Sequence, residues 1–170
     1  MTDWPKKIIT VLFAIYAVWC LIHPADWHFI DTVNLFIHEG GHFVFMPFGM
    51  FLYILGGSLM QILMPFLFVI YFYYQQQYAS SAVCLFWMGE SVLNVAVYAG
   101  DAVRMQLSLL FGDDSIHDWN WLLIYTGQLH HTIGIAFAIK LIGLLLVTAS
   151  IVWIMWATFY TDLERKVATQ

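Results

Sequence analysis

One short stretch combines residue types that could bind a metal ion and activate water: His38-Glu39-Gly40-Gly41-His42, an HExxH sequence. On a helix, residues four apart lie on one face, so both imidazoles can reach one zinc ion. The glutamate between them projects near the same ion and can accept a proton from its water. We therefore expect His38 and His42 to bind Zn²⁺ and Glu39 to act as general base.

The rest of the composition places this motif in an apolar setting. Hydrophobic residues make up 62% of the 170-residue chain and charged residues 10%, against about 45–50% and 25% in soluble domains. A soluble globular fold and a disordered chain are both excluded as defaults. The net charge of -5 and the lack of a basic stripe make nucleic acid an unexpected partner. The chain is expected to be an integral, multi-pass membrane protein surrounded by lipid, where ionisable residues mark functional sites.

The apolar segments predict an all-α, polytopic bundle of about five to six transmembrane helices in a single domain, residues 1–170. Spans are expected at about 8–23, 29–46, 51–74, 79–100 and 134–160, with a short or re-entrant helix at about 119–131. Lys6 and Lys7 place the N-terminus in the cytoplasm by the positive-inside rule. Arg165 and Lys166 favour the same side for the C-terminus, which a six-span count satisfies.

A catalytic zinc site usually has three protein ligands and one open position, so a third ligand must reach the depth of His42. If helices alternate in direction, the second and fourth spans run parallel. The fourth ends near Asp101, at about the level of His42. Asp101 is therefore the expected third ligand. This end of the helices would share the side of the N-terminus, and the site would open toward the cytoplasm.

Other polar residues could assist at this site. Glu90 and Asn94 precede Asp101 on the fourth span and form a polar stripe facing the metal helix, where Asn94 could hold the substrate strand or an oxyanion. His117, in the loop on the same side, has three readings: a further metal ligand, a hydrogen-bond donor to substrate, or a surface residue. Asp118 could orient a ligating histidine.

These residues resemble the site-2 protease family of intramembrane zinc metalloproteases. The resemblance rests on His38, Glu39 and His42 in a membrane helix and on Asp101 at the end of a later helix. It implies a membrane-embedded zinc hydrolase, a metallopeptidase that cleaves transmembrane or membrane-proximal peptides. The small-residue stretch at 56–58 is similar to one that follows the metal helix in that family. The segment 94–101 has the family's asparagine but not its prolines.

Three alternatives stay open on the residues alone. A non-catalytic membrane subunit could use His117 as a fourth ligand of a structural zinc site. A zinc-dependent lipid or amide hydrolase would use the same ligands as a peptidase. A membrane di-iron oxidase could recruit His130 and His131, although such enzymes need about eight nitrogen ligands by that resemblance and the chain has 7 histidines.

Overall fold

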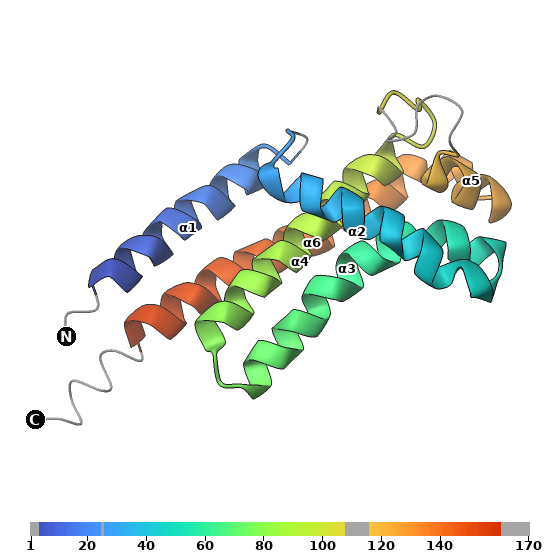
Figure 1. Ribbon diagram of the computed structural model, residues 1–170. Helices are drawn as coiled ribbons and strands as arrows, with labels where there is room; N and C mark the ends of the chain where they lie inside the picture. Colours follow the sequence, from blue (N-terminus) through green and yellow to red (C-terminus); the bar gives the residue numbers. More distant parts are fainter. Residues whose placement is uncertain (1–3, 25, 108–115, 161–170) are drawn as a thin grey trace, which may run out of the picture.

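The computed structural model describes residues 4–24, 26–107 and 116–160, and every regular element within them is helical (Figure 1). The α-helices are α1 (Trp4–Ile22), α2 (Phe29–Phe45), α3 (Met50–Tyr74), α4 (Tyr78–Gly100), α5 (Asp118–Tyr125) and α6 (Thr132–Met155). Three short turns, η1 (Met46–Phe48), η2 (Leu129–His131) and η3 (Trp156–Tyr160), join or extend them. The expected all-α helical bundle is confirmed.

Four helical segments are long and apolar enough to cross a membrane, which is compatible with a membrane protein. They are α1, α3, α4 and the stretch Leu129–Phe159, which contains α6. The expected second span, α2, has 17 residues, fewer than the roughly 20 that a span needs. The described residues therefore hold four candidate spans rather than five or six, and the short helix expected near 119–131 is present as α5 and η2.

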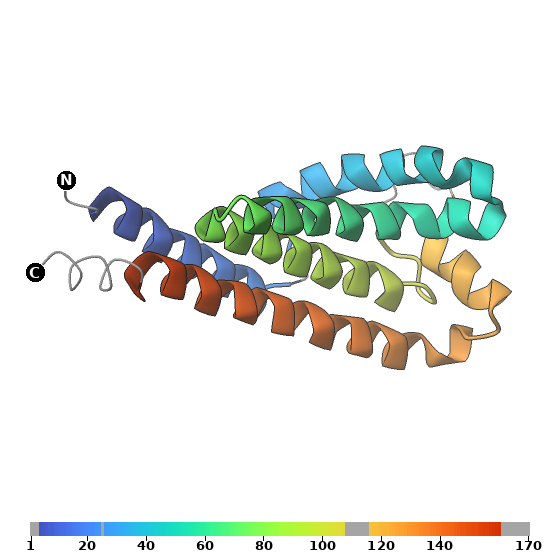
Figure 2. The same ribbon diagram turned by 90° about the horizontal axis from the view of Figure 1, so that it is seen from below.

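The central helix is α4, which packs against α3 and α6 (Figures 1 and 2). Glycines at the interface let helix backbones approach closely. A Cβ at Gly89 of α4 would lie 2.8 Å from Val147 of α6, and one at Gly143 of α6 would lie 2.7 Å from Leu93 of α4. These contacts fix α4 against α6 on one side, while polar side chains of α4 reach α2 on another.

The beginning of α1 and the end of the C-terminal helix lie at the same end of the bundle (Figures 1 and 2). There, Oγ1 of Thr10 lies 3.0 Å from Oγ1 of Thr158. At the opposite end of α6, a Cβ at Gly100 of α4 would lie 3.4 Å from Cβ of Ala136. The end of α4 is therefore remote from the beginning of α1.

The end of α4 and the beginning of α1, which were expected to share one side, lie at opposite ends of the bundle because of the course of α2 (Figures 1 and 2). A full crossing by α2 would bring the chain back to the level at which α1 begins. Instead, α2 runs obliquely and leads into α3 without returning to the start of α1 (Figure 1). Each later helix therefore runs in the opposite direction to the expected one. The four remaining segments alternate in direction, so the first begins and the last ends at the same end of the bundle (Figures 1 and 2). Arg165 and Lys166, which favour the side of the N-terminus for the C-terminus, lie outside the described residues.

Helices α2 and α3 are joined by a tight turn and pack backbone against backbone. Pro47 lies in η1, and Gly49 then adopts a φ of +93°, a backbone conformation that residues other than glycine rarely adopt. A Cβ at Gly41 would collide with the carbonyl oxygen of Gly56. Gly41 therefore allows α2 to approach the backbone of α3 closely, whereas a Cβ at Gly40 would have no atom within 4 Å.

Candidate metal centre

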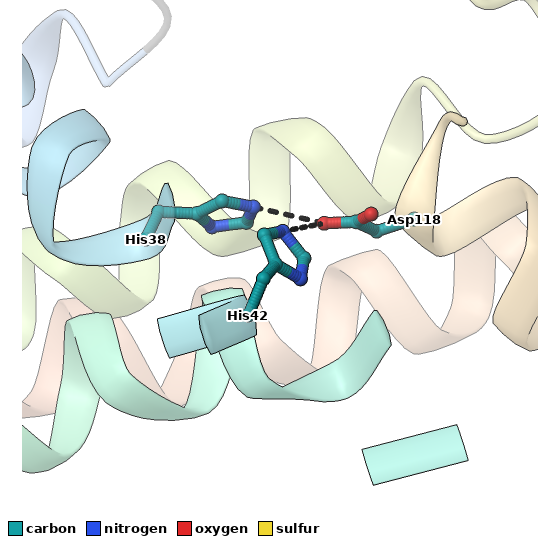
Figure 3. A group of neighbouring side chains, drawn as sticks. All are labelled: His38, His42 and Asp118. Carbon is teal, nitrogen blue, oxygen red and sulfur yellow. Dashed lines mark hydrogen bonds and ion pairs between the residues drawn. The ribbon is translucent and has the colours of Figure 1, made fainter. Parts of the chain in front are cut away.

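Three side chains that could bind one metal ion converge where α2 meets the first turn of α5 (Figure 3). Nε2 of His38 lies 2.8 Å from Oδ2 of Asp118, and Nε2 of His42 lies 3.2 Å from the same oxygen. Ligand atoms around a tetrahedral zinc ion, with bonds of about 2.0–2.2 Å, stand about 3.3–3.5 Å apart. The two histidines are one helical turn apart on α2, as the HExxH spacing predicts.

The other nitrogen of each imidazole is held by a hydrogen-bond acceptor. Nδ1 of His42 lies 2.8 Å from the backbone oxygen of Tyr53, which can only accept. Nδ1 of His38 lies 3.3 Å from Oε1 of Gln61, whose amide nitrogen donates to the Ser91 carbonyl and to Asn94. Both imidazoles can therefore donate from Nδ1, and in the neutral ring Nε2 then has a lone pair directed at Asp118.

This protonation pattern makes the site suited to a cation. Two nitrogen atoms and a carboxylate oxygen point at one small volume, where their lone pairs repel each other unless a positive charge, either protons on Nε2 or a metal ion, lies between them. Imidazole and carboxylate are ordinary zinc ligands, and partners on the far nitrogens are the usual way in which proteins orient ligating histidines. The residues present therefore fit a bound Zn²⁺.

The beginning of α5 is held in place by its neighbours, which fixes Asp118. The backbone N–H of Asp118 donates to Oη of Tyr98 at 3.0 Å. The indole N–H of Trp119 donates to Oγ of Ser58 at 3.1 Å, and the side-chain amide of Asn120 donates to the backbone oxygen at 102, 2.7 Å away. Contacts to α3, to α4 and to the end of α4 thus position one carboxylate.

The carboxyl group of Asp118 is only 4% exposed. Burial by itself raises the pKa of Asp118, but the hydrogen bonds and charges of His38 and His42 outweigh it and lower this pKa below its ordinary value. The group is therefore ionised at neutral pH. An ionised carboxylate is the form that binds a metal ion.

A glycine on α3 makes room for the first histidine. A Cβ at Gly57 would lie 2.5 Å from Nε2 of His38 and 2.7 Å from its Cδ2 and Cε1. The imidazole therefore lies against the bare backbone of α3. The small-residue stretch at 56–58 therefore has two effects. Gly56 lets α2 pack closely on α3, and Gly57 leaves space for the imidazole of His38.

The structure does not bring Asp101, the expected third ligand, to the two histidines. Asp101 ends α4, and its carboxylate accepts from the backbone N–H groups of Gln106 at 3.1 Å and Leu107 at 2.9 Å. The same carboxylate lies 3.4 Å from Nε2 of His117. Asp101 is occupied by its own loop, because the chain turns immediately after α4 and returns to the motif only at α5.

His117 is likewise placed as a support rather than a ligand. Its Nδ1 accepts from the backbone N–H of Asn120 at 3.2 Å, so that it caps α5. The ring proton is then on Nε2, which faces Asp101 without forming a hydrogen bond of good geometry. Among the three readings of His117, the geometry favours a residue that ties the loop to the start of α5.

The expected base, Glu39, is half-buried beside the histidines on α2. Its carboxylate is close enough to His42 and Tyr98 to interact with both electrostatically. Within the described part of the chain, no hydrogen bond or ion pair occupies it. A carboxylate that is near the ligands but not engaged by them is available for proton transfer.

Asn94 and Glu90 face α2, as the expected polar stripe requires, but they meet it before the motif. Asn94 donates to Asp31 at 2.9 Å and accepts from Gln61 at 2.8 Å, which leaves one amide N–H for any substrate. Glu90 is buried and accepts from Asn34 at 2.7 Å. The structure places Glu90 in a buried network next to the metal centre rather than at its opening.

Sequence reasoning missed three contributors. The sequence predicts Asp118 only as a residue that orients a histidine, although its position in the polar string 117–120 also favours a ligand role. Gln61 and Tyr98 gave no signal, because single polar residues inside apolar helices do not reveal what they face. His130 and His131, considered for a di-iron site, are exposed in η2 and, among the described residues, join no group of potential ligands.

Comparisons of the chain with protein-family models, with curated proteins and with solved structures find no match.

Proposed function

We propose that this protein is a membrane-embedded zinc hydrolase of the site-2 protease kind, in which His38, His42 and Asp118 hold the zinc ion. The observation that carries the proposal is the convergence of two Nε2 atoms and one buried carboxylate on a single point, with both Nδ1 atoms at hydrogen-bond distance from acceptors elsewhere. Three protein ligands and an open fourth position are characteristic of catalytic zinc.

The division of labour follows from the side chains. Zinc, when bound, supplies Lewis acidity that activates water and polarises a carbonyl group. Glu39 takes a proton from the attacking water and delivers it to the leaving group, because no described residue forms a hydrogen bond or ion pair with its carboxylate. Tyr98 accepts from Asp118 through its oxygen, which leaves its own O–H to donate to the oxygen on which negative charge develops.

A catalytic role is better supported than a structural one. A structural site would need a fourth protein ligand to close the coordination sphere. His117, the candidate for that position, uses its Nδ1 as an acceptor and directs Nε2 toward Asp101. Described residues thus supply three ligands and an unengaged glutamate, a combination that serves hydrolysis.

Peptides within or near the membrane are the proposed substrates. The site is enclosed by α2, α3, α4 and α5, among segments long and apolar enough to lie in a bilayer. In the topology we propose, the chain is multi-pass, Lys6 and Lys7 keep the N-terminus in the cytoplasm, and the metal centre lies toward the opposite face of the membrane.

The decisive experiment replaces Glu39 with Gln in protein purified in detergent. Zinc content is measured by elemental analysis, and turnover by a library of quenched-fluorescent peptides with apolar segments. The variant should keep its zinc and lose turnover by about 100-fold or more, the scale of general-base catalysis. Full activity in the variant, or four protein ligands in the X-ray absorption spectrum of the wild type, would overturn the proposal.

A further inference from the structure

A second group of potential metal ligands lies near the beginning of α2. His28, Asp31 and Glu90 are each only 4% exposed. One ring nitrogen of His28, one oxygen of Asp31 and one of Glu90 all lie within 4.8 Å of one another. Asp31 and His38 are seven residues apart on the same helix, which separates this group from the metal centre by about 10 Å along the axis.

Both carboxyl groups in this cluster are oriented by hydrogen-bond donors that remain in place if the side chains bind a metal ion. The oxygens of Asp31 accept from the backbone N–H of His28 at 2.6 Å and from Asn94 at 2.9 Å. Oε2 of Glu90 accepts from the amide of Asn34 at 2.7 Å.

The orientation of Asn34 is itself fixed, so this last contact has a defined direction. Its carbonyl oxygen accepts from the indole N–H of Trp87 at 2.8 Å and from the hydroxyl of Ser91 at 3.1 Å. The amide of Asn34 can only donate to Glu90. Such outer partners are what holds metal-binding carboxylates in place.

The cluster lacks a matching positive charge. Among the described residues, no lysine or arginine pairs with Asp31 or Glu90, and the imidazole of His28, 3.4 Å from Oδ2 of Asp31, is the one basic group in reach. The other ring nitrogen, Nε2 of His28, is buried and has no hydrogen-bond partner. Two buried carboxyl groups with a single imidazole beside them are costly unless a cation joins them.

We propose that His28, Asp31 and Glu90 form a second metal site, for a divalent transition-metal ion such as Zn²⁺ or Mn²⁺. One nitrogen and two oxygens suit these ions, and the set is richer in carboxylate than the two-nitrogen, one-oxygen centre at His38. A chain of hydrogen bonds links the two sites, from Nδ1 of His38 through Gln61 and Asn94 to Asp31.

Zinc stoichiometry tests this proposal separately from the hydrolase. Detergent-purified protein is stripped with a chelator, loaded with Zn²⁺ and desalted, and zinc per chain is measured by mass spectrometry. We expect two equivalents in the wild type, one in Asp118→Asn, one in Glu90→Gln and none in the double variant. Because Glu90→Gln could disturb folding, His28→Gln is measured as well, and helicity and elution volume are recorded for each protein.

The outcomes separate the two claims. One equivalent in the wild type that persists in Glu90→Gln and His28→Gln, and disappears in Asp118→Asn, would show that the carboxyl groups share a proton instead of a metal ion. Two equivalents that persist in both Glu90→Gln and His28→Gln would place the second ion elsewhere and equally overturn the proposal. Two equivalents in folded Asp118→Asn would contradict the metal centre and leave the second site standing.

Discussion

Nε2 of His38 lies 2.8 Å from Oδ2 of Asp118, although 80 residues separate them in sequence. The contact joins a motif on α2 to the first residue of α5, across helices α3 and α4. It adds a third potential ligand to the two nitrogen atoms of the HExxH sequence.

Asp118 and Asp101 can be separated by the same substitution. Asp118→Asn removes a charged ligand, so zinc affinity should fall by more than the roughly 10–100-fold that loss of a supporting partner costs. Asp101→Asn keeps one of the two oxygens that accept from the loop N–H groups and should leave zinc affinity near that of the wild type. Competition with a chromophoric chelator measures both, and the reverse order of effects would restore Asp101 as the ligand.

Gly57 should be intolerant of any side chain. In Gly57→Ala, the new Cβ would lie 2.5 Å from Nε2 of His38, so the imidazole or α3 must shift. We expect weaker zinc binding and a loss of stability of about 1–3 kcal/mol, as for other overpacked interiors. Gly40→Ala is the matched control, because its Cβ would meet no atom within 4 Å. Unfolding in denaturant measures the stability of both variants, and zinc titration measures their affinity. Equal stability and equal zinc affinity in the two variants would contradict the packing of His38 against Gly57.

Gln61 should govern zinc affinity without touching the ion. Gln61→Met keeps the side-chain volume but removes the acceptor of the His38 Nδ1 proton, so zinc affinity should fall by about 10–100-fold. Gln75→Met, in the exposed residue that follows α3, should have no effect. Recovery of affinity in Gln61→Glu, which restores an acceptor, would separate this role from a general packing defect.

Tyr98 should affect turnover more than metal binding. Tyr98→Phe removes a hydroxyl donor, and the loss of one such donor commonly lowers kcat by about 100-fold or more. Tyr53→Phe serves as its control, because His42 uses only the backbone oxygen of Tyr53. Zinc content and kcat are measured on the same preparations. A loss of zinc in parallel with activity would assign Tyr98 to holding Asp118 alone.

The proposed sidedness can be measured by labelling single cysteines in a chain without Cys20 and Cys84. Trp4→Cys lies at the beginning of α1 and Arg104→Cys follows the end of α4, both at exposed positions. A membrane-impermeant maleimide should label the second variant in intact cells and the first only after lysis. Labelling of both from the same side would show that the end of α4 and the N-terminus share a face.

The local features of this protein were predictable from its sequence. Apolar runs of membrane length, broken at polar stretches, determined the all-α fold, because burial in lipid demands both length and hydrophobicity. The i, i+4 spacing of His38 and His42 placed both imidazoles on one face, because the helical repeat fixes side-chain direction within a turn. Glu39, between them, needed no tertiary information to be named.

Only the tertiary structure decided which carboxylate lies beside His38 and His42 and at which end of the bundle this group lies. Asp101 and Asp118 are alike in type and both lie near the end of α4. The carboxylate of Asp101 accepts hydrogen bonds from the residues that follow it, whereas the carboxylate of Asp118 contacts both histidines. Depth along the fourth span could not reveal this difference. Nor could hydropathy show that α2 runs obliquely, which is a matter of how Gly41 and Gly56 pack. Contacts between segments distant in sequence depend on the path of the whole chain, and local spacing does not encode that path.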